Sequence, residues 1–487
     1  MVPGPEDEFH DPLDAAARLS REWLDGMPTR SIVARADVEQ VKDALGRDLA
    51  DAGVDPVEVV ESLSAAVEPG LIAMQSPRFF GWVIGGTAPS ALAADWLVSA
   101  WDQNAALREV TPGVNGAEEL AAEWLCDLLG LPSGTVAGFT TGATTANLVA
   151  LAAARHAVLE RVGWDDAVDG IQGAPRIRVF AGDDHHPSVD VALRWLGLGR
   201  PVDVATDDQG RMLPEALEAA LAVGAGSAAG EDGRGDDGAG DDGSGDDGSG
   251  DDRPSPAIVC LQAGNIHSGA SDPFEACVGV AHAAGAWAHV DGAFGLWVAA
   301  SGRLRHLVAG VELADSWATD AHKTLNVPYD AGIVAVADPA PLVAAMTMHA
   351  AYLPAAATGI DAADRVLELS RRARGVPTYA ALRTLGRDGV AELVDGLADA
   401  ATALAEGLRA MEGVEVLNEV VFTQVCAAFD GHDVAELARA LDDDGVALAH
   451  PSRWRGRDVL RFSVSNRSTD AAATAATLDA VRRVLAG

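Results

Sequence analysis

One lysine stands out among the residues that could carry covalent chemistry. The chain has 487 residues but only two lysines, Lys42 and Lys323, against 33 arginines. Lys323 directly follows the mostly apolar run DSWATDAH at 315–322. A Schiff base with a carbonyl compound requires a primary amine made nucleophilic by its surroundings, and arginine cannot replace it. A surface lysine without a role is the alternative, which the aromatic and apolar neighbours disfavour. Lys323 is therefore predicted to bind a carbonyl group covalently.

Two motifs upstream of this lysine could bind the other parts of a carbonyl compound that also carries an aromatic ring and a phosphate group. Asp291 ends an apolar run, AWAHV at 286–290. A carboxylate there can keep a pyridine nitrogen protonated, although a loop carboxylate or helix cap is about as consistent. In TTGATTAN at 140–147, glycine and threonines precede a helical stretch, where backbone N–H groups attract phosphate. Ordinary capping would explain that motif equally well when it is taken alone.

The order of phosphate loop, aspartate and lysine resembles the group II decarboxylases that depend on pyridoxal 5'-phosphate (PLP). These enzymes belong to the fold type I, aspartate aminotransferase-like superfamily, and they include aromatic-L-amino-acid, glutamate and 2,4-diaminobutyrate decarboxylases. The resemblance runs from about Pro77 to the end of the chain. It includes the segments SPRFFGWVIGGTAPSALAADWL at 76–97 and TPGVNGAEELAAEWLCDLLGLP at 111–132.

The resemblance implies a role in PLP binding for eight residues. Lys323 would form the Schiff base with His322 beside it, and Asp291 would pair with the ring nitrogen. His186 would stack on the ring; it is preferred to His185 because the family has His, any residue, Ser. The remaining cofactor contacts would be Ala143 and Thr144 at the phosphate, Ala293 at the ring face, and Asn265, which stands where the family has threonine. No metal is expected.

Two further residues bear on the reaction and its substrate carboxylate. In decarboxylases of this group, a tyrosine on a mobile loop 29 positions after the lysine protonates the carbanion, and Tyr352 stands at that spacing. Arg461, in VLRFSVSNRSTD at 459–470, would bind the α-carboxylate bidentately. The predicted activity is decarboxylation of an L-amino acid. The alternatives are a PLP-dependent aminotransferase or other lyase and, less favoured, a non-catalytic PLP-binding protein.

The substrate side chain is less well defined by the sequence. Phe80, Trp82 and Trp101 fall in segments that line the family's pocket, and their rings favour an aromatic substrate. Glutamate, aspartate or 2,4-diaminobutyrate remain open, and the tryptophans could equally belong to the core or an interface. Two departures stand near the lysine: Thr324 replaces a common tryptophan, and Asp320 replaces an asparagine. An acid beside phosphate would be repulsive unless it is turned away or hydrogen bonded.

Alternating apolar runs and helical segments must position these residues. Strand-like runs occur at 177–182, 257–264, 286–294, 315–322 and 332–338. This pattern predicts the α/β class, with a mostly parallel central sheet of the seven-stranded type covered by helices on both faces. Ligands bind beyond the carboxyl ends of the strands in such sheets.

The chain is expected to divide into three parts. Residues 1–76 read as a helical arm that could pack on a partner subunit, with an amphipathic run at 37–52. Residues 77–374 form the large PLP-binding domain, and 375–487 a small α+β domain with a long helix at 377–411. The large domain is interrupted at 224–256 by a Gly/Asp/Ser repeat that cannot bury apolar surface and reads as a solvated insertion.

Composition excludes several partners. A net charge of −38 would repel nucleic acid and anionic membranes, so a small-molecule amino acid is the expected partner, with a homodimer implied by the resemblance. Four scattered cysteines read as buried thiols of a reducing cytoplasm. The acid excess and near absence of lysine suggest a halophilic protein, while a GC-rich genome would explain the lysine loss but not the acids.

Overall fold

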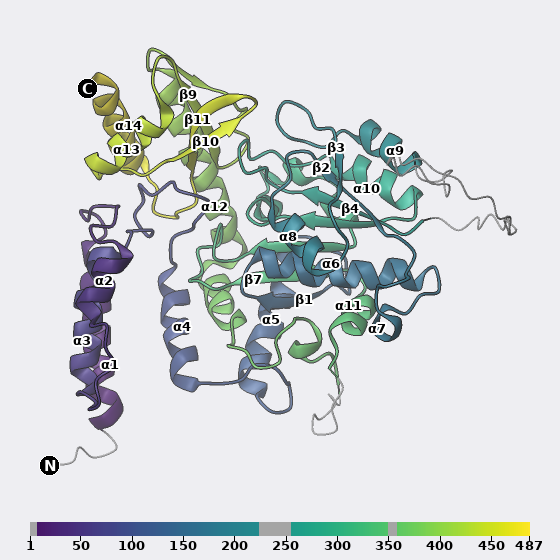
Figure 1. Cartoon of the computed structure of the whole chain (residues 1–487), viewed down its shortest axis with the longest axis horizontal. Coiled ribbons are helices and arrows are strands. Elements are labelled where there is room, and N and C mark those ends of the chain that lie inside the picture. Colours follow the sequence, from purple (N-terminus) through teal and green to yellow (C-terminus); the bar gives the residue numbers. More distant parts are fainter. Residues whose placement is uncertain (1–6, 224–254, 349–357) are drawn as a thin grey trace, which may run out of the picture. The chain divides into compact units, whose positions relative to one another are not determined.

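The computed structural model describes residues 7–223, 255–348 and 358–487 (Figure 1). The chain forms two compact units. The sheet unit comprises Ser90–Ala321 and Tyr329–Glu392, and the terminal unit comprises Met1–Pro89, His322–Pro328 and Leu393–Gly487. The predicted boundaries after residues 76 and 374 stay a prediction.

A seven-stranded sheet organises the sheet unit, with the strand order β1-β7-β6-β5-β4-β2-β3. All neighbouring strands are parallel except β7, which is antiparallel to both β1 and β6. The carboxyl ends of the other six strands therefore meet at one edge. The strands are β1 (Val136–Thr140), β2 (Arg178–Gly182), β3 (Val202–Val204), β4 (Ala257–Gln262), β5 (Trp287–Asp291), β6 (Ser316–Asp320) and β7 (Gly332–Val336).

Helices cover both faces of this sheet. On one face, α6 (Ala143–Glu160) packs against α8 (Ser188–Trp195) and α11 (Pro339–Met346), and its alanine-rich surface meets Ile258 and Cys260 of β4. The alternate β4 residues point to the other face and are buried as well, where α10 (Phe274–Ala283) contacts β4 and β5. Continuous apolar strands are what this two-sided burial requires. The same unit holds α4 (Pro89–Trp101), α5 (Pro112–Leu128), α7 (Asp166–Asp169), α9 (Pro214–Ala222), η2 (Gly295–Ala300), η3 (Arg305–Val308), η4 (Val311–Leu313) and η5 (Ala362–Asp364).

The terminal unit combines helices from both ends of the chain with a small antiparallel sheet. The N-terminal helices are α1 (Asp7–Gly26), α2 (Val38–Leu45) and α3 (Pro56–Val67), followed by η1 (Glu68–Gly70). The sheet has the order β10-β11-β9-β8. Its strands and C-terminal helices are β8 (Val414–Val416), β9 (Gln424–Phe429), β10 (His450–Trp454), β11 (Arg457–Ser463), α13 (Val434–Asp444) and α14 (Ala471–Ala486). The long helix α12 (Gly375–Arg409) kinks at Gly386 and runs from the sheet unit into the terminal unit.

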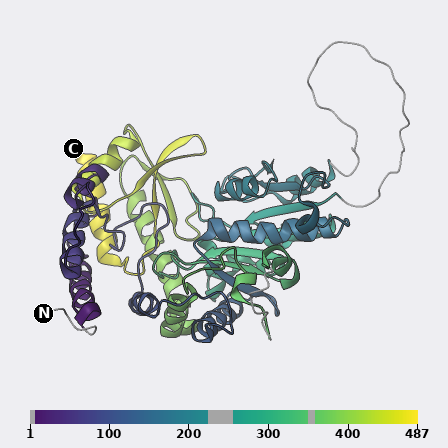
Figure 2. The same ribbon diagram turned by 60° about the horizontal axis from the view of Figure 1, so that its bottom comes forward.

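These elements confirm the predicted α/β class, the seven-stranded sheet, the helical N-terminal segment and the small α+β part at the C-terminus (Figure 2). Two details differ. Helix α2 ends at Leu45 because Gly46 adopts φ +86°, well before the predicted 52. Cys126 is only partly buried, whereas Cys260, Cys277 and Cys426 are buried as expected. Most of the acidic insertion lies outside the described residues. Within them, no helix is both long and apolar enough to span a membrane.

Candidate active site

Asp291 is the anchor of the candidate site in the sheet unit. It is the last residue of β5 and is only 6% exposed. Asn147 Nδ2 donates to its Oδ2 at 2.9 Å, and Ser188 Oγ lies 3.3 Å from the same oxygen. The Ala293 N–H donates to Oδ1 at 3.2 Å. Charge-assisted bonds of this kind stabilise negative charge on a buried carboxylate.

His186 precedes α8 and is joined to Asp291 through one serine. Its Nδ1 lies 2.8 Å from Ser188 Oγ and accepts a bond from the Ser188 N–H at 3.2 Å. The residue as a whole is exposed. The neighbouring His185 is instead held at both nitrogens, by the Gly182 carbonyl at 2.7 Å and by Asp190 at 3.1 Å. The choice of His186 over His185 as the cofactor contact stays a prediction.

The start of α6 provides the backbone N–H groups predicted to bind phosphate. Gly142 is the N-cap, and Ala143 opens the helix. The Ala143 N–H donates to Asp320 Oδ1 at 2.6 Å, so the acid in the family's asparagine position is hydrogen bonded, as its placement beside phosphate would require. Thr144 is exposed on the first turn. A side chain at Gly332, the first residue of β7, would meet Gly142 Cα at 2.4 Å, so two backbones touch here.

Asn265 is fully buried and bonded both within its own loop and to Asp184. Its Nδ2 donates to Asp184 Oδ2 at 2.9 Å, and its Oδ1 accepts bonds from the backbone N–H groups of His267 and Ser268. The amide oxygen therefore serves the turn after β4, and the amide nitrogen links this turn to the segment after β2. The structure shows a positioning role for the loop, and direct cofactor contact by Asn265 stays a prediction.

A narrow cavity lies at the carboxyl end of β2, β4 and β5. It brings His186 together with Asp291, beyond the strand ends where ligands bind in this fold. Its lining consists of Gly182, Asp184, His185, His186, Val189, Gly210, Cys260, Leu261, Gln262, Asp272 and Asp291.

Lys323 belongs to the terminal unit, three residues after β6. The turn that carries it is fixed by Asn326, whose Nδ2 donates to the carbonyls of Lys323, Thr324 and Ser465 at 2.9–3.1 Å. Asn326 Oδ1 accepts bonds from the Gly86 and Arg467 N–H groups. Asn326 is fully buried with φ +57°, a conformation that asparagine tolerates better than most residues. His322 is also buried in this turn.

Gly85 closes over the same turn, because a Cβ there would stand 2.1 Å from the Lys323 carbonyl oxygen. The segment 322–328 is therefore embedded in the terminal unit on two sides. A lysine on an over-determined turn is suited to covalent work, since its backbone does not shift when its side chain reacts.

Arg461 lies on β11 of the same unit, with a buried side chain. His450 on β10 is its cross-strand partner, and the Trp82 ring lies 4.8 Å from the His450 ring. Burial lowers the pKa of Arg461, and burial together with Arg461 lowers the pKa of His450. His450 is thus neutral at neutral pH, and the guanidinium carries the positive charge of this group.

The predicted aromatic residues occupy different environments. Trp82 is 43% exposed, with φ +49°. Phe80 is buried in the core of the terminal unit and packs edge-on against Phe462 at 5.9 Å, so its role at a substrate stays a prediction. Trp101 ends α4 in the sheet unit and is exposed. Tyr352 lies outside the described residues.

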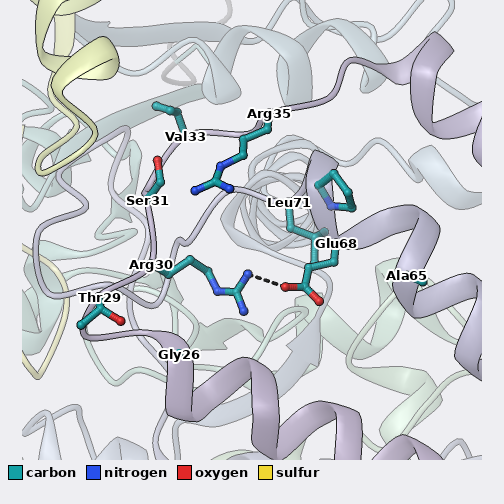
Figure 3. Close-up of a pocket in the computed structure, with 10 residues that line it drawn as sticks. Gly26, Thr29, Arg30, Ser31, Val33, Arg35, Ala65, Glu68 and Leu71 are labelled. Atoms are coloured by element: carbon teal, nitrogen blue, oxygen red, sulfur yellow. Dashed lines mark hydrogen bonds and ion pairs between the residues drawn. The ribbon is translucent and has the colours of Figure 1, made fainter.

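A second cavity, of about 540 Å³, lies in the N-terminal segment of the terminal unit (Figure 3). Arg30 extends into it and donates to Glu68 at 2.6 Å, and Arg35 points toward the same space. None of the predicted site residues lines this cavity.

Known proteins resemble this chain along most of its length. Tryptophan decarboxylase 1 of Oryza sativa subsp. japonica is 28% identical over 435 residues, which cover 84% of this chain and 80% of the relative. Human cysteine sulfinic acid decarboxylase is 26% identical over 398 residues, covering 80% of this chain and 74% of the relative. Among solved structures, Oryza sativa TDC with PLP and tryptamine matches with a TM-score of 0.87 at 23% identity, covering 100% of this chain and 99% of that one. Mouse CSAD matches with a TM-score of 0.86 at 22% identity, covering 99% of each chain.

The sheet order defines an α/β protein with the fold of these solved structures. The model of the pyridoxal-dependent decarboxylase conserved domain matches residues 39–227 and 251–429. The chain therefore belongs to the pyridoxal-dependent decarboxylase family: it is a carboxy-lyase that uses PLP to decarboxylate an amino acid.

The residues present fit PLP. Asp291 is a buried carboxylate with three donors and spare lone pairs, which suits a protonated pyridine nitrogen, and it shares a cavity with His186. The first turn of α6 offers backbone N–H groups for a phosphate. In the terminal unit, the turn of Lys323 is fixed by a buried asparagine.

Reasoning from the sequence missed four residues that lie beside the predicted site residues, two in the sheet unit and two in the terminal unit. Asn326 and His450 gave no signal, because each acts through partners far away in the chain. Asn147 is one turn after Ala143 on α6, and His289 is two residues before Asp291 on β5. Helical and strand periodicity could have placed those two beside predicted site residues.

Proposed function

We propose that this decarboxylase acts on an aromatic L-amino acid, and that Lys323, Asp291 and Arg461 each have a role in the reaction. The observation that carries the choice of substrate is the group formed by Trp82, His450 and Arg461 in the terminal unit. It combines one buried cation with two aromatic rings.

In this proposal, Lys323 Nζ would hold PLP covalently, and Asp291 would hold the proton of the ring nitrogen. His186 and Ala293 would contact the ring. Ala143, Thr144, Asn265 and His322 complete the cofactor contacts. When bound, PLP supplies an electron sink for the electron pair that remains at Cα when carbon dioxide leaves.

The protein's own groups then orient the substrate and move one proton. Arg461 binds the α-carboxylate, since a guanidinium matches a carboxylate with two parallel hydrogen bonds. The Tyr352 hydroxyl gives its proton to Cα after carbon dioxide departs. Lys323 Nζ releases the amine product.

The side-chain pocket favours an aromatic ring over an acid. A substrate with a second carboxylate would need a second cation, and His450, the residue paired with Arg461 across the strands, is neutral at neutral pH. The partly exposed Trp82 ring offers a face for stacking, and the exposed Trp101 is a further proposed substrate contact. A tryptophan decarboxylase is among the relatives, although decarboxylases of acidic amino acids are also present.

A panel of L-amino acids tests the substrate. PLP-loaded protein is incubated with tryptophan, tyrosine, phenylalanine, glutamate, aspartate, cysteine sulfinate and 2,4-diaminobutyrate, and carbon dioxide and amine are both measured. Release from the aromatic members alone is expected. Release only from acidic members would refute the aromatic assignment, and keto acid without carbon dioxide would indicate a transaminase.

Two substitutions test the catalytic roles. Lys323→Ala should abolish both turnover and the visible absorbance of lysine-bound cofactor. Tyr352→Phe should lose amine production, with some oxidative deamination to aldehyde. Tyr379→Phe is the matched control, because Tyr379 stacks on Trp124 at 5.2 Å in the sheet unit. Wild-type amine yield from Tyr352→Phe would exclude that role.

We further propose a homodimer with shared active sites in which the N-terminal helices pack on a second copy. Helices α2 and α3 contain no buried residue. Large apolar side chains on this segment are exposed, namely Phe9, Leu13, Leu24, Val38, Leu45, Leu49, Val54, Val59 and Leu63. Sedimentation of the full chain should give the dimer mass. A monomer at micromolar concentration would contradict the proposal.

A cytoplasmic location and a preference for high salt also fit the composition. Activity should rise between dilute buffer and molar potassium chloride, because salt screens the repulsion within a chain of net charge −38. Higher activity in dilute buffer would exclude the halophilic assignment.

A further inference from the structure

A chain of buried hydrogen bonds runs from β5 into the carboxylate of Asp291. Trp287, His289 and Asp291 alternate along β5 and point to the face covered by α6. Trp287 Nε1 donates to Ser316 Oγ at 2.9 Å, and that hydroxyl lies 2.9 Å from His289 Nδ1. His289 Nε2 lies 2.9 Å from Asn147 Oδ1, and Asn147 Nδ2 donates to Asp291 Oδ2 at 2.9 Å. Asn147, His289 and Ser316 are fully buried.

The Trp287 indole and the Asp291 carboxylate, at the two ends of this chain, set the donor and the acceptor of every hydrogen bond between them. An indole N–H can only donate, and an ionised carboxylate can only accept. Asn147 must turn its amide nitrogen toward Asp291, so its oxygen faces His289 and requires a proton on Nε2. Nδ1 of a neutral His289 then accepts the Ser316 hydroxyl proton, and the lone pair of that hydroxyl takes the Trp287 proton.

His289 is neutral in this arrangement. Complete burial lowers its pKa to about 4, against the smaller opposing effects of the Asp291 charge and of a hydrogen bond with the Ser316 backbone. A protonated ring would confront Ser316 with two donors, from His289 Nδ1 and Trp287 Nε1, and would place a second positive charge near Asp291.

We propose that Asn147 and His289 are positioning residues that orient Asp291 through this one-directional relay and reserve its negative charge for the ring nitrogen of PLP. The inference rests on the proposed role of Asp291. A neutral relay gives the carboxylate a fixed donor without adding a cation that would compete with the pyridinium.

The tautomer of His289 tests the relay without any cofactor. In protein labelled with ¹⁵N-histidine, the His289 signal is identified by its loss in His289→Gln. A neutral ring with the proton on Nε2 is expected from pH 5 to pH 8. A proton on Nδ1, or a charged ring at pH 6, would overturn the assignment.

Holoenzyme variants test the consequence for the cofactor. His289→Phe should weaken PLP binding about tenfold, the size expected when support for a hydrogen bond to a charged group is lost. In holoenzyme reconstituted with ¹⁵N-labelled PLP, the ring nitrogen signal should shift toward the unprotonated form. His289→Gln, which can still donate to Asn147 Oδ1, should retain most of both properties. The kcat should fall in His289→Phe while KM for the amino acid changes little.

His156→Phe is the matched control, because His156 is also a buried histidine but bonds Asp166, at 2.7 Å, and has no part in the relay. It should lose stability but keep the wild-type ring nitrogen signal. A wild-type signal and wild-type PLP affinity in His289→Phe would refute the relay. Asn147→Leu provides a second variant should His289→Phe fail to fold. If no amino acid of the substrate panel released carbon dioxide, the proposed function would be refuted. The PLP affinity, the ring nitrogen signal and the His289 tautomer would still show whether the relay exists.

Discussion

The carboxylate of Asp320 accepts a hydrogen bond from the backbone N–H of Ala143, 2.6 Å away at the start of α6. The Asp320 carboxylate thus accepts from one of the backbone N–H groups that the proposed phosphate site would use. Helix starts bind carboxylates and phosphates for the same reason, so the two anions compete for this end of the helix.

Asp320→Asn should therefore strengthen PLP binding several-fold. The neutral amide can still accept from Ala143 while the repulsion of the phosphate disappears. Equilibrium dialysis of PLP at low salt measures the change, and molar salt should reduce it. Asp338→Asn is the control, since Asp338 caps α11 through Ala340 in the same manner. Weaker PLP binding by Asp320→Asn would contradict the expected competition.

Asn326→Ala should destabilise the protein by at least about 2 kcal/mol, because it leaves buried backbone groups without partners and places alanine at φ +57°. Asn326→Gly removes the conformational cost alone and should recover only part of the loss. Urea denaturation measures both. The yield of PLP fixed to Lys323 by borohydride reduction should fall in both variants, and an undiminished yield would show that the turn does not depend on Asn326.

Glu118→Gln should cost about 3 kcal/mol, since it leaves the Arg371 guanidinium buried without its charge partner. Glu118 accepts from Arg371 Nη1 at 3.1 Å and from the Gly375 N–H at 2.8 Å, which ties α5 to the start of α12. The thermal midpoint gives the readout. The exposed pair of Arg482 and Asp479 supplies a comparison, and Asp479→Asn should change stability by less than about 1 kcal/mol.

The pH dependence of stability should carry a signature of His289. Its folded pKa of about 4 lies below the ordinary value of 6.5, so the unfolded chain binds an extra proton between these values. Stability is lost as the pH falls through this window. Between pH 7 and pH 5, the wild type should lose about 2 kcal/mol more than His289→Gln in urea denaturation. Equal losses would mean that His289 does not titrate on unfolding.

The sequence predicted those features that depend on local pattern. Apolar runs placed Asp291 at a strand end and Lys323 just after β6, and glycine followed by a good helix located the start of α6. Strand alternation would also have put His289 on the face of Asp291, but a histidine in an apolar run gains meaning only with its partners. Those partners, Asn147 and Ser316, belong to other elements.

Long-range packing explains what the sequence could not provide. Asn326 precedes a valine and a proline in an unremarkable loop, and its role depends on Gly86 and Ser465, more than one hundred residues away in each direction. Phe80 belongs to an aromatic segment predicted to line a pocket, yet its ring completes the core beneath β11 through Phe462. Residue type alone does not distinguish these environments.

The contact between Gly332 and Gly142 has a consequence for redesign of this enzyme. Because two main chains touch with no side chain between them, the distance from β7 to the first turn of α6 has no adjustable part. Libraries that seek a bulkier or smaller cofactor analogue would gain nothing from randomising Gly332. Diversity is better spent on Thr144, whose exposed side chain can change size and charge without displacing the backbone.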